Sequence, residues 1–399
     1  MKVRFINTYE PVSSFYRDLL PYLAGRGMEV EVLLSSAEYQ TERPLLQNAL
    51  KHPGIRIHYI PVGGISSRRR GNKVLTMICY ALGTACWTLF KRGKYLNFFL
   101  SQPPLFTLWG YVLKVLRGQP YCSLVMDLYP DVAVQGNVIP PSGALTAFLK
   151  RLAEISLNNA DALIGIGRCM EERLRQNGVV NADLEVIPNW ADERSIYPAP
   201  MAAQRFRKRW GLEGKFIVLY SGNMGISHHF GDLLEVARRL RDHQNIRFLF
   251  IGDGIKRGQV EQIKETHALE NVLILPFQPL ESLPASLSAG NLHFMSLAPG
   301  FEGLVVPSKA YAAMAVGRPI LYQGHPVGEI ARTVLEELVG TVVGPGAPDA
   351  LEDAVVWYYQ NPDVVAAQGG RARDLALRRF SRKRAVEKYY SLIREKLQE

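Results

Sequence analysis

Residues 295–322 read MSLAPGFEGLVVPSKAYAAMAVGRPILY, and this stretch predicts a strand–loop–helix–strand unit. The apolar run from Asn291 to Leu297 has the character of a buried strand. Pro307 suits the first turn of the helix that follows, Lys309–Val316, because proline lacks the N–H that would have no partner there. Gly317 and a proline two positions later end that helix. A unit of this kind is typical of a parallel sheet covered by helices.

The loop between the predicted strand and helix has the composition of an anion site. Gly300 and Gly303 flank Glu302, and Ser308 precedes the helix. A glycine-bearing loop that opens a helix gathers free backbone N–H groups at the positive end of the helix dipole, and a diphosphate is the usual occupant of such a site. An ordinary connection between a strand and a helix is the alternative.

The same alternation of strands and helices extends over the whole chain and predicts two doubly wound parallel sheets. In the first half the predicted strands are Lys2–Asn7, Glu29–Leu34, Arg56–Pro61, Leu96–Ser101, Tyr121–Met126 and Ala162–Ile166. In the second half they are Phe216–Ser221, Ile246–Gly252, Val272–Pro276, Leu292–Leu297, Pro319–Tyr322 and Gly340–Val343.

The segment Pro188–Glu213 is loop-rich and separates the two series, so we place a domain boundary within it. The predicted fold class is α/β, with one Rossmann-like domain over residues 1–195 and a second over residues 196–379. A charged amphipathic helix is predicted for residues 380–399. Two such domains place their ligand crevices at the carboxyl ends of the strands, facing each other across a cleft, which suits an enzyme with two substrates.

Composition and charge limit the possible partners. The four cysteines among 399 residues show no C-x-x-C motif and no metal-ligand spacing, so we predict reduced thiols and no metal site. Residues 1–120 hold 16 Lys+Arg against 6 Asp+Glu, whereas the remaining residues hold 31 of each. The whole net charge of +10 thus lies in the first third, which favours an anionic partner there; a scattered, solvated excess is the alternative. The N-terminus MKVRFINTYEP lacks an apolar core, so we expect no signal peptide.

Two further glycine turns follow strands of the second half. Ser221–Gly225 reads SGNMG, and Gly252-Asp253-Gly254 closes the next predicted strand. Small glycine turns let backbone N–H groups approach a phosphate, although plain turns have the same composition. Together with the loop at 300–308, three strand ends of one domain carry such turns, and this convergence favours a phosphorylated ligand.

Several common site motifs are absent from the sequence. The opening turn Thr8–Ser14 has no glycine, so the G-x-G-x-x-G fingerprint of NAD or FAD binding is missing there. No P-loop sequence and no H-E-x-x-H motif occurs. The pair His228-His229 is interpreted as loop chemistry or surface, since adjacent rings diverge on a helix. No aromatic–basic motif indicates nucleic-acid binding.

Asp127 and Asp131, in the segment DLYPD, follow a predicted strand of the first domain. Two carboxylates at the lip of a crevice are able to bind hydroxyls or to act in acid–base chemistry. Turn formation and capping are the alternative. Asn189 follows the run Val186–Pro188 and is a second candidate either for capping or for substrate contact.

Val74–Phe90 contains 17 residues and no charge, and basic residues lie on both sides of it. These are Arg68, Arg69, Arg70 and Lys73 before the run, and Lys91, Arg92 and Lys94 after it. Three interpretations stay open: a helix buried between layers, a helix at the surface of an anionic membrane, and a membrane span, which normally needs about 20 apolar residues. Trp109–Arg117 is a second apolar–basic stretch and supports a surface role.

Five segments occur in a specific order along the chain: DLYPD (127–131), VIPNWAD (186–192), YSGNMG (220–225), IGDG (251–254), and EGLVVPSK followed by AMAVGRP (302–319). Together they resemble the family 4 retaining glycosyltransferases of the GT-B fold, and most closely the bacterial enzymes that build colanic acid, capsule and O-antigen. The resemblance covers nearly the whole chain. It implies a nucleotide-sugar donor on the second domain, an acceptor on the first, a C-terminal helix that returns to the first domain, and no metal or cofactor.

The resemblance and the residue chemistry together predict a site. The expected catalytic residues are Glu302, Asp127 and Lys309. The expected donor-binding residues are Gly222, Asn223, His229, Gly252, Phe277, Gly303, Leu304, Val305 and Ser308. Leu304 and Ala312 occupy positions where the family usually has a pair of glutamates, so Glu302 is a candidate to replace the first carboxylate, and Lys309 to carry more of the diphosphate charge.

The predicted function is retaining transfer of a sugar from a nucleotide diphosphate, UDP in our interpretation, to a lipid-linked saccharide in cell-surface polysaccharide biosynthesis. The enzyme is expected in the cytoplasm, peripheral at the inner face of the plasma membrane. Two alternatives stay open. Donor consumption without an acceptor favours a nucleotide-sugar epimerase or hydrolase on the same fold, and failure to bind any nucleotide sugar favours a non-catalytic binding protein.

Overall fold

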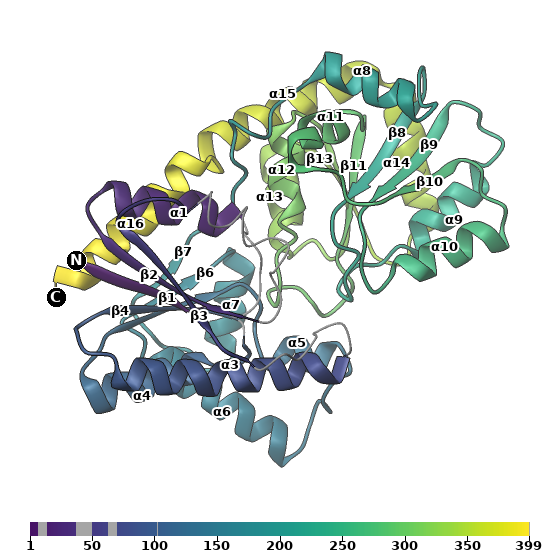
Figure 1. Cartoon of the computed structure of the whole chain (residues 1–399). Coiled ribbons are helices and arrows are strands. Elements are labelled where there is room, and N and C mark those ends of the chain that lie inside the picture. Colours follow the sequence, from purple (N-terminus) through teal and green to yellow (C-terminus); the bar gives the residue numbers. More distant parts are fainter. Residues whose placement is uncertain (7–13, 37–49, 63–69, 102, 399) are drawn as a thin grey trace. The chain divides into compact units, whose positions relative to one another are not determined.

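The structure is a computed structural model that describes residues 1–6, 14–36, 50–62, 70–101 and 103–398 (Figure 1). The chain divides into two compact units: unit 1 comprises Met1–Pro188 with Lys383–Glu399, and unit 2 comprises Asn189–Arg382. Each unit contains one parallel sheet covered by helices, so the predicted fold of two Rossmann-like domains is confirmed. Residues 8–13 of the predicted opening turn lie outside the described residues.

Unit 1 is built on seven strands in the order β3-β2-β1-β4-β5-β6-β7, and every neighbouring pair is parallel. The register places Phe5 opposite both Val32 and Phe98. The strands are β1 (Lys2–Ile6), β2 (Glu29–Ser35), β3 (Ile55–Ile60), β4 (Leu96–Leu100), β5 (Tyr121–Val125), β6 (Ala162–Gly165) and β7 (Leu184–Val186). β4, β5 and β6 are buried at every position because helices cover both faces, which explains why they are continuous apolar runs.

Two helices that are far apart in the sequence pack together in unit 1. The rings of Phe15, on α1 (Ser14–Gly25), and Tyr389, on α16 (Arg382–Gln398), lie 5.3 Å apart in an edge-to-face arrangement. The predicted return of the C-terminal helix to the first domain is therefore confirmed. The other helices of unit 1 are α3 (Arg70–Phe90), α4 (Thr107–Arg117), α5 (Asp131–Gln135), α6 (Ala144–Asn158) and α7 (Arg168–Gln176).

Helix α3 follows neither the fully buried nor the spanning interpretation of the run Val74–Phe90. Its inward face is formed by Thr76, Tyr80, Thr84 and Thr88, which are buried, and its outward face carries the exposed side chains of Val74, Leu75, Ile78, Leu82 and Phe90. None of the helices that the structure describes is both long enough and apolar enough to cross a membrane.

Unit 2 has six parallel strands in the order β10-β9-β8-β11-β12-β13. They are β8 (Phe216–Ser221), β9 (Ile246–Ile251), β10 (Val272–Leu275), β11 (Leu292–Ser296), β12 (Ile320–Gln323) and β13 (Gly340–Val343). Along β8, Val218 and Tyr220 point into one core cluster and Ile217 and Leu219 into another, as the two-residue period of a strand requires.

The helices of unit 2 cover both faces of this sheet. On one side α9 (Gly231–Arg239) packs against α14 (Pro348–Gln360), and on the other α8 (Pro200–Arg209) packs against α11 (Leu283–Ser288). The remaining helices are α10 (Arg257–Thr266), α12 (Lys309–Ala315), α13 (Glu329–Glu337), α15 (Pro362–Arg379) and the short 3-10 helix Leu280–Ser282.

The division between the units lies at Pro188, earlier than the break predicted after residue 195, and the chain returns to unit 1 after Arg382 rather than after residue 379. Contacts within unit 2 explain this. Ala191 forms a parallel bridge with Ser381, and the backbone N–H of Arg382 donates to the carboxylate of Glu193 at 2.8 Å. Long-range pairing of this kind has no local sequence signal.

Candidate functional site

The strand order of the sheet in unit 2 reverses between β8 and β11, and ligands of open α/β sheets bind at such a point, beside the carboxyl ends of the strands. The loops that follow β8 and β9 are joined there by backbone hydrogen bonds. The N–H of Gly222 donates to Ile251 at 2.8 Å, and that of Met224 donates to Asp253 at 2.7 Å. The predicted turns at 221–225 and 252–254 therefore form one continuous surface.

Glycine is required at two positions because other atoms pass very close. A Cβ added to Gly252, whose φ is +139°, would lie 2.1 Å from the carbonyl oxygen of Gly222. A Cβ added to Gly222, whose φ is +136°, would lie 2.5 Å from Cε of Lys309. The absence of a side chain at Gly252 allows the two turns to touch. The absence of a side chain at Gly222 leaves room for the side chain of Lys309.

Lys309 places its ammonium among uncharged groups. Its Nζ lies 2.7 Å from Nε2 of His228 and 5.1 Å from the centre of the Tyr220 ring. Within the described part of the chain it forms no ion pair with a carboxylate. Burial lowers the pKa of Lys309 to about 8, so the side chain is still largely protonated at neutral pH. The result is a partly buried positive charge without an acidic partner.

His228 is buried and neutral, and sequence analysis did not identify it as a site residue. Its Nδ1 lies 2.7 Å from the carbonyl oxygen of Ser296, and its own carbonyl accepts a hydrogen bond from the ammonium of Lys256. Burial, and next the charge of Lys309, lower the pKa of His228 to about 3. Burial also lowers the pKa of Lys256. The interpretation of the histidine pair as surface holds for His229 alone.

His229 is exposed and lies on the other side of the same loop. Its backbone N–H donates to Oγ of Ser296 at 3.0 Å, and its Nε2 lies 3.4 Å from a carboxylate oxygen of Asp232. Ser296 is the last residue of β11, so this one residue fixes both histidines, the first through its carbonyl and the second through its hydroxyl.

Glu302 lies in the loop between β11 and α12 with one oxygen bound and one unpaired. Its Oε2 accepts a hydrogen bond from the N–H of Gly300 at 2.7 Å, which shapes the loop. Its Oε1 is buried and has no hydrogen-bond partner among the described residues. An unpaired buried acceptor is costly, and a hydroxyl donor from a ligand would relieve that cost.

The other predicted donor-site residues differ in what they expose. The side chains of Asn223, Phe277 and Ser308 are exposed, and Val305 is partly buried. Gly303 adopts φ +74°, and Leu304 is only 1% exposed, so its side chain supports the loop from the core. The described residues include no group of three or more His, Cys, Asp or Glu side chains placed to hold a metal ion.

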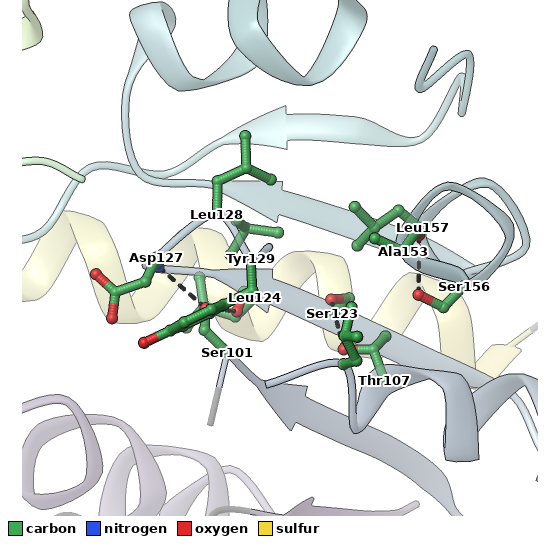
Figure 2. Close-up of a pocket in the computed structure, with 12 residues that line it drawn as sticks. Ser101, Thr107, Ser123, Leu124, Asp127, Leu128, Tyr129, Ala153, Ser156 and Leu157 are labelled. Carbon is green, nitrogen blue, oxygen red and sulfur yellow. Dashed lines mark hydrogen bonds between the residues drawn. The ribbon is translucent and has the colours of Figure 1, made fainter. Parts of the chain in front are cut away.

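Asp127 belongs to unit 1, where it follows β5 and borders a small cavity (Figure 2). The N–H groups of Met126 and Asp127 both donate to Oγ of Ser101, at 2.6 and 3.1 Å. The cavity has a volume of about 30 Å³, and the hydroxyls of Ser101, Thr107, Ser123 and Ser156 are among the groups that line it. Figure 2 shows the Asp127 carboxylate at one end of this group, directed away from Thr107 and Ser123. The cavity has room for water but not for a sugar.

Asp131, the second carboxylate of the DLYPD segment, has a structural role. It is buried at the start of α5, where it forms an ion pair with Lys150 at 3.1 Å and accepts a hydrogen bond from Asn177 at 3.0 Å. These groups line a separate cavity of about 280 Å³ between α5, α6 and α7. The alternative of a structural carboxylate therefore applies to Asp131, and Asp127 remains the candidate for substrate contact.

Two family models match this chain in succession. Residues 12–190 match the model described as "Glycosyl transferase 4-like domain", and residues 215–361 match the model described as "Glycosyl transferases group 1". The two matches fall on unit 1 and unit 2 respectively and together include every predicted site residue.

Individual proteins agree with these matches. The chain is 29% identical over 303 residues to glycosyltransferase WbjE of Pseudomonas aeruginosa, covering 75% of this chain and 74% of that protein. It is 28% identical over 243 residues to WcaI of Escherichia coli K12, whose name assigns it to colanic acid biosynthesis, covering 60% of this chain and 58% of that protein. Among solved structures, Anabaena HepE in complex with UDP superimposes with a TM-score of 0.76 at 15% identity over 99% of this chain and 100% of that one, which shows a shared fold.

Proposed function

This chain belongs to the GT-B glycosyltransferases, with a 4-like first domain and a group 1 second domain, and acts in glycan biosynthesis; from that premise we propose that it moves a sugar from UDP to a lipid-linked saccharide with retention at the anomeric carbon. We further propose that it works in the cytoplasm, held at the inner face of the plasma membrane, and that neither a metal nor a cofactor takes part.

The observation that carries the donor proposal is the ammonium of Lys309. It is partly buried, it has no carboxylate partner among the described residues, and its stem lies against Gly222, which has no side chain. A desolvated cation without a counter-ion favours binding of an anion, and a diphosphate supplies one. HepE, which shares this fold, forms a complex with UDP, and this supports UDP as the donor nucleotide.

In the proposed reaction the bond between the anomeric carbon and the β-phosphate oxygen of UDP breaks, and a bond forms from that carbon to the oxygen of the acceptor hydroxyl. Negative charge grows on the departing β-phosphate, which takes up the proton of that hydroxyl. Lys309 stabilises this charge more strongly in the transition state than in the ground state, because its position is set before the reaction. Glu302 accepts a hydrogen bond from a hydroxyl of the sugar at its unpaired Oε1, or stabilises positive charge that develops on the sugar ring. Asp127 binds the acceptor hydroxyl on unit 1.

The remaining contacts with the donor are assigned to side chains that are exposed on the loops of unit 2. The ring of Phe277 is 57% exposed just beyond the carboxyl end of β10, where it is available to stack on the base. Asn223 and Ser308 are exposed polar side chains on the loops after β8 and before α12, and we assign both to the diphosphate.

Helix α3 carries the proposal of a membrane surface. Its buried residues Thr76, Tyr80, Thr84 and Thr88 recur every four positions. The exposed Val74, Ile78 and Leu82 do the same on the opposite side, and the exposed Phe90 lies eight positions after Leu82. Two of the inward polar groups bond within the fold: Tyr80 donates to the carbonyl of Leu33 at 2.8 Å, and Thr88 accepts from Trp109 at 2.8 Å. The buried Oγ1 atoms of Thr76 and Thr84 have no hydrogen-bond partner among the described residues. The apolar stripe of α3 therefore faces away from the core of unit 1.

Two further helices of unit 1 also expose apolar side chains. Helix α4, which contacts α3, exposes Val115 and Leu116, and helix α6, which contacts α4, exposes Leu145 and Phe148. Arg92, Lys94 and Arg117 lie at the carboxyl ends of α3 and α4 and supply positive charge. Apolar side chains bordered by basic ones fit an anionic lipid surface. Arg68 and Arg69, predicted to contribute, lie outside the described residues. An acceptor carried by a lipid would be presented at the same surface.

A binding screen of the full-length protein tests the donor proposal. UDP, GDP, ADP and dTDP are titrated by calorimetry, and their glucose conjugates are then followed for release of free sugar and for transfer. We expect UDP to bind most tightly and UDP-sugar turnover to require an acceptor. Turnover of the donor without any acceptor would favour the epimerase or hydrolase alternative, and failure of every nucleotide to bind would favour a non-catalytic protein.

A further inference from the structure

His228 and Lys309 form a side-chain pair that joins the loop after β8 to the first residue of α12, 81 positions away in the sequence. Their nitrogens lie 2.7 Å apart, which is a short contact for two groups that can both carry a positive charge. The pair is stable only if one member is neutral and accepts the hydrogen bond that the other donates.

The surroundings of the imidazole determine which member accepts. Nδ1 of His228 lies 2.7 Å from the carbonyl oxygen of Ser296, and a carbonyl only accepts hydrogen bonds, so Nδ1 must carry the hydrogen. In the neutral ring Nε2 then holds a lone pair directed at the lysine. Lys309 therefore donates to His228 and keeps its other two N–H bonds for a ligand.

The ring itself is held from several directions. It packs edge-on against Tyr220, with centroids 5.7 Å apart, and beside Phe230 at 6.2 Å. The backbone N–H of His228 donates to the carbonyl of Gly225 at 3.2 Å, and the backbone carbonyl of His228 accepts a hydrogen bond from Lys256. Among the described residues, the titratable side chains in contact with the pair are Lys256 and Tyr220, and neither is a carboxylate that would hold the Lys309 ammonium in place.

The lysine side chain has little else to define its position. Its stem crosses Gly222, which has no side chain, and its ammonium contacts only His228 and the face of Tyr220 among the described residues. A lysine has a flexible four-carbon stem, and ordering it at the moment of binding lowers affinity.

We propose that His228 is a positioning residue for the nucleotide diphosphate: by accepting a hydrogen bond at Nε2 it holds the ammonium of Lys309 in place before the donor binds. This inference rests on the proposed donor site. It assigns His228 no contact with the reacting atoms, and its effect on the ligand passes through Lys309.

Two substitutions separate the two hydrogen bonds of His228. In His228→Gln the side-chain amide oxygen is able to reach the position of Nε2 and accept from Lys309. In His228→Asn the shorter amide is able to replace Nδ1 and donate to Ser296, but nothing reaches the lysine. We expect UDP affinity, measured by calorimetry at pH 7, to fall about tenfold in His228→Asn and clearly less in His228→Gln, with both variants folded by circular dichroism.

A double-mutant cycle completes the test. If His228 acts through Lys309, His228→Asn causes no further loss of UDP affinity in a Lys309→Ala background. A purely structural role predicts the reverse order of the two variants, or an additive loss in the double variant, and either result overturns the inference. Different results would contradict the proposed donor site itself. It is wrong if the unmodified protein does not bind UDP, or if Lys309→Ala binds UDP as tightly as the unmodified protein does.

Discussion

The sheets of units 1 and 2 share one construction, since each changes strand order at its centre, between β1 and β4 in unit 1 and between β8 and β11 in unit 2. The groups at the strand ends differ. In unit 2 glycine turns surround Lys309, a cation without an acidic partner among the described residues. In unit 1 Asp127 borders a cavity lined by hydroxyl groups. One backbone framework therefore presents positive charge in one unit and a carboxylate in the other.

The helix layers of the two units differ in the same way. Helix α9 in unit 2 buries Leu233, Leu234 and Val236, and outside it Glu235 pairs with Arg238 at 2.7 Å. Helix α3 in unit 1 reverses this order, with hydroxyl groups inside and apolar side chains outside. An ion-paired face is compatible with water, whereas an outward apolar face needs another partner to cover it. Shared architecture sets the positions, and the side chains at those positions determine which ligand fits.

The largest effect is expected from Lys309→Ala, which removes the charge that distinguishes unit 2. A hydrogen bond to a charged group is worth about 1.5–3 kcal/mol, so UDP affinity should fall about tenfold to a hundredfold. Isothermal titration calorimetry measures this, and Lys309→Arg is the matched control that keeps the charge. An unchanged dissociation constant in Lys309→Ala would remove this residue from the donor site.

The outward face of α3 is tested by the double substitution of Ile78 and Leu82 by serine. If each side chain contributes about 1 kcal/mol by entering the lipid, partitioning onto vesicles should weaken about thirtyfold. Co-flotation with vesicles containing anionic lipid, at low and high salt, measures the partitioning. The matched control replaces Met201 and Leu377, exposed apolar residues of unit 2, by serine and should bind like the unmodified protein. Equal absence of flotation on anionic and neutral vesicles at low salt would contradict the membrane proposal.

Glu302→Gln tests whether Glu302 contacts the sugar of the donor or its phosphates. We expect turnover to fall about tenfold, because a carboxylate accepts a hydrogen bond roughly twice as strongly as a neutral group does. Affinity for UDP, which lacks the sugar, should change by less than about twofold. Steady-state rates at saturating donor and calorimetry with UDP provide the two measurements. A parallel loss of both would show that Glu302 acts only by holding the N–H of Gly300 and shaping the loop.

The smallest expected effect is the change of UDP affinity with pH. Burial lowers the pKa of Lys309 to about 8, so the unliganded protein loses this charge as pH rises through that value. Affinity for UDP should therefore fall about fourfold between pH 7 and 8.5, a range in which the terminal phosphate is already ionised. Lys309→Arg should show no such decline, and an equal decline in that variant would assign the pH dependence to another group.

The same pKa has a predictable effect on folding. Because the folded-state pKa of Lys309 lies below the ordinary value of 10.5, the unfolded chain binds more protons between about pH 8 and 10.5. The contribution of Lys309 to stability therefore rises with pH across this window. Thermal unfolding of the unmodified protein and of Lys309→Ala over the same pH range shows the difference.

The sequence alone determined the elements and their class. Apolar runs of four to seven residues separated by helical periods predict strands and helices, and the alternation of the two predicts parallel sheets. The strand at 216–221 and the helix that begins at Lys309 were predicted with the limits that the structure shows at those points. Gly222, Gly252 and Lys309 were also predicted as site residues, because glycine turns and a basic residue beside them have a local signature, and their role at the donor site stays a prediction.

Only the tertiary structure decided how these residues meet. The pairing of β8 with β11 brings Ser296 within hydrogen-bonding distance of His228, and no local pattern encodes a contact 68 positions apart. The direction in which α3 faces was equally hidden, since its apolar run fitted a buried helix as well as an exposed one. Periodicity and turn chemistry act between near neighbours and are visible in the sequence. Burial, the choice of hydrogen-bond partner and the pKa of Lys309 depend on groups that only the folded chain brings together.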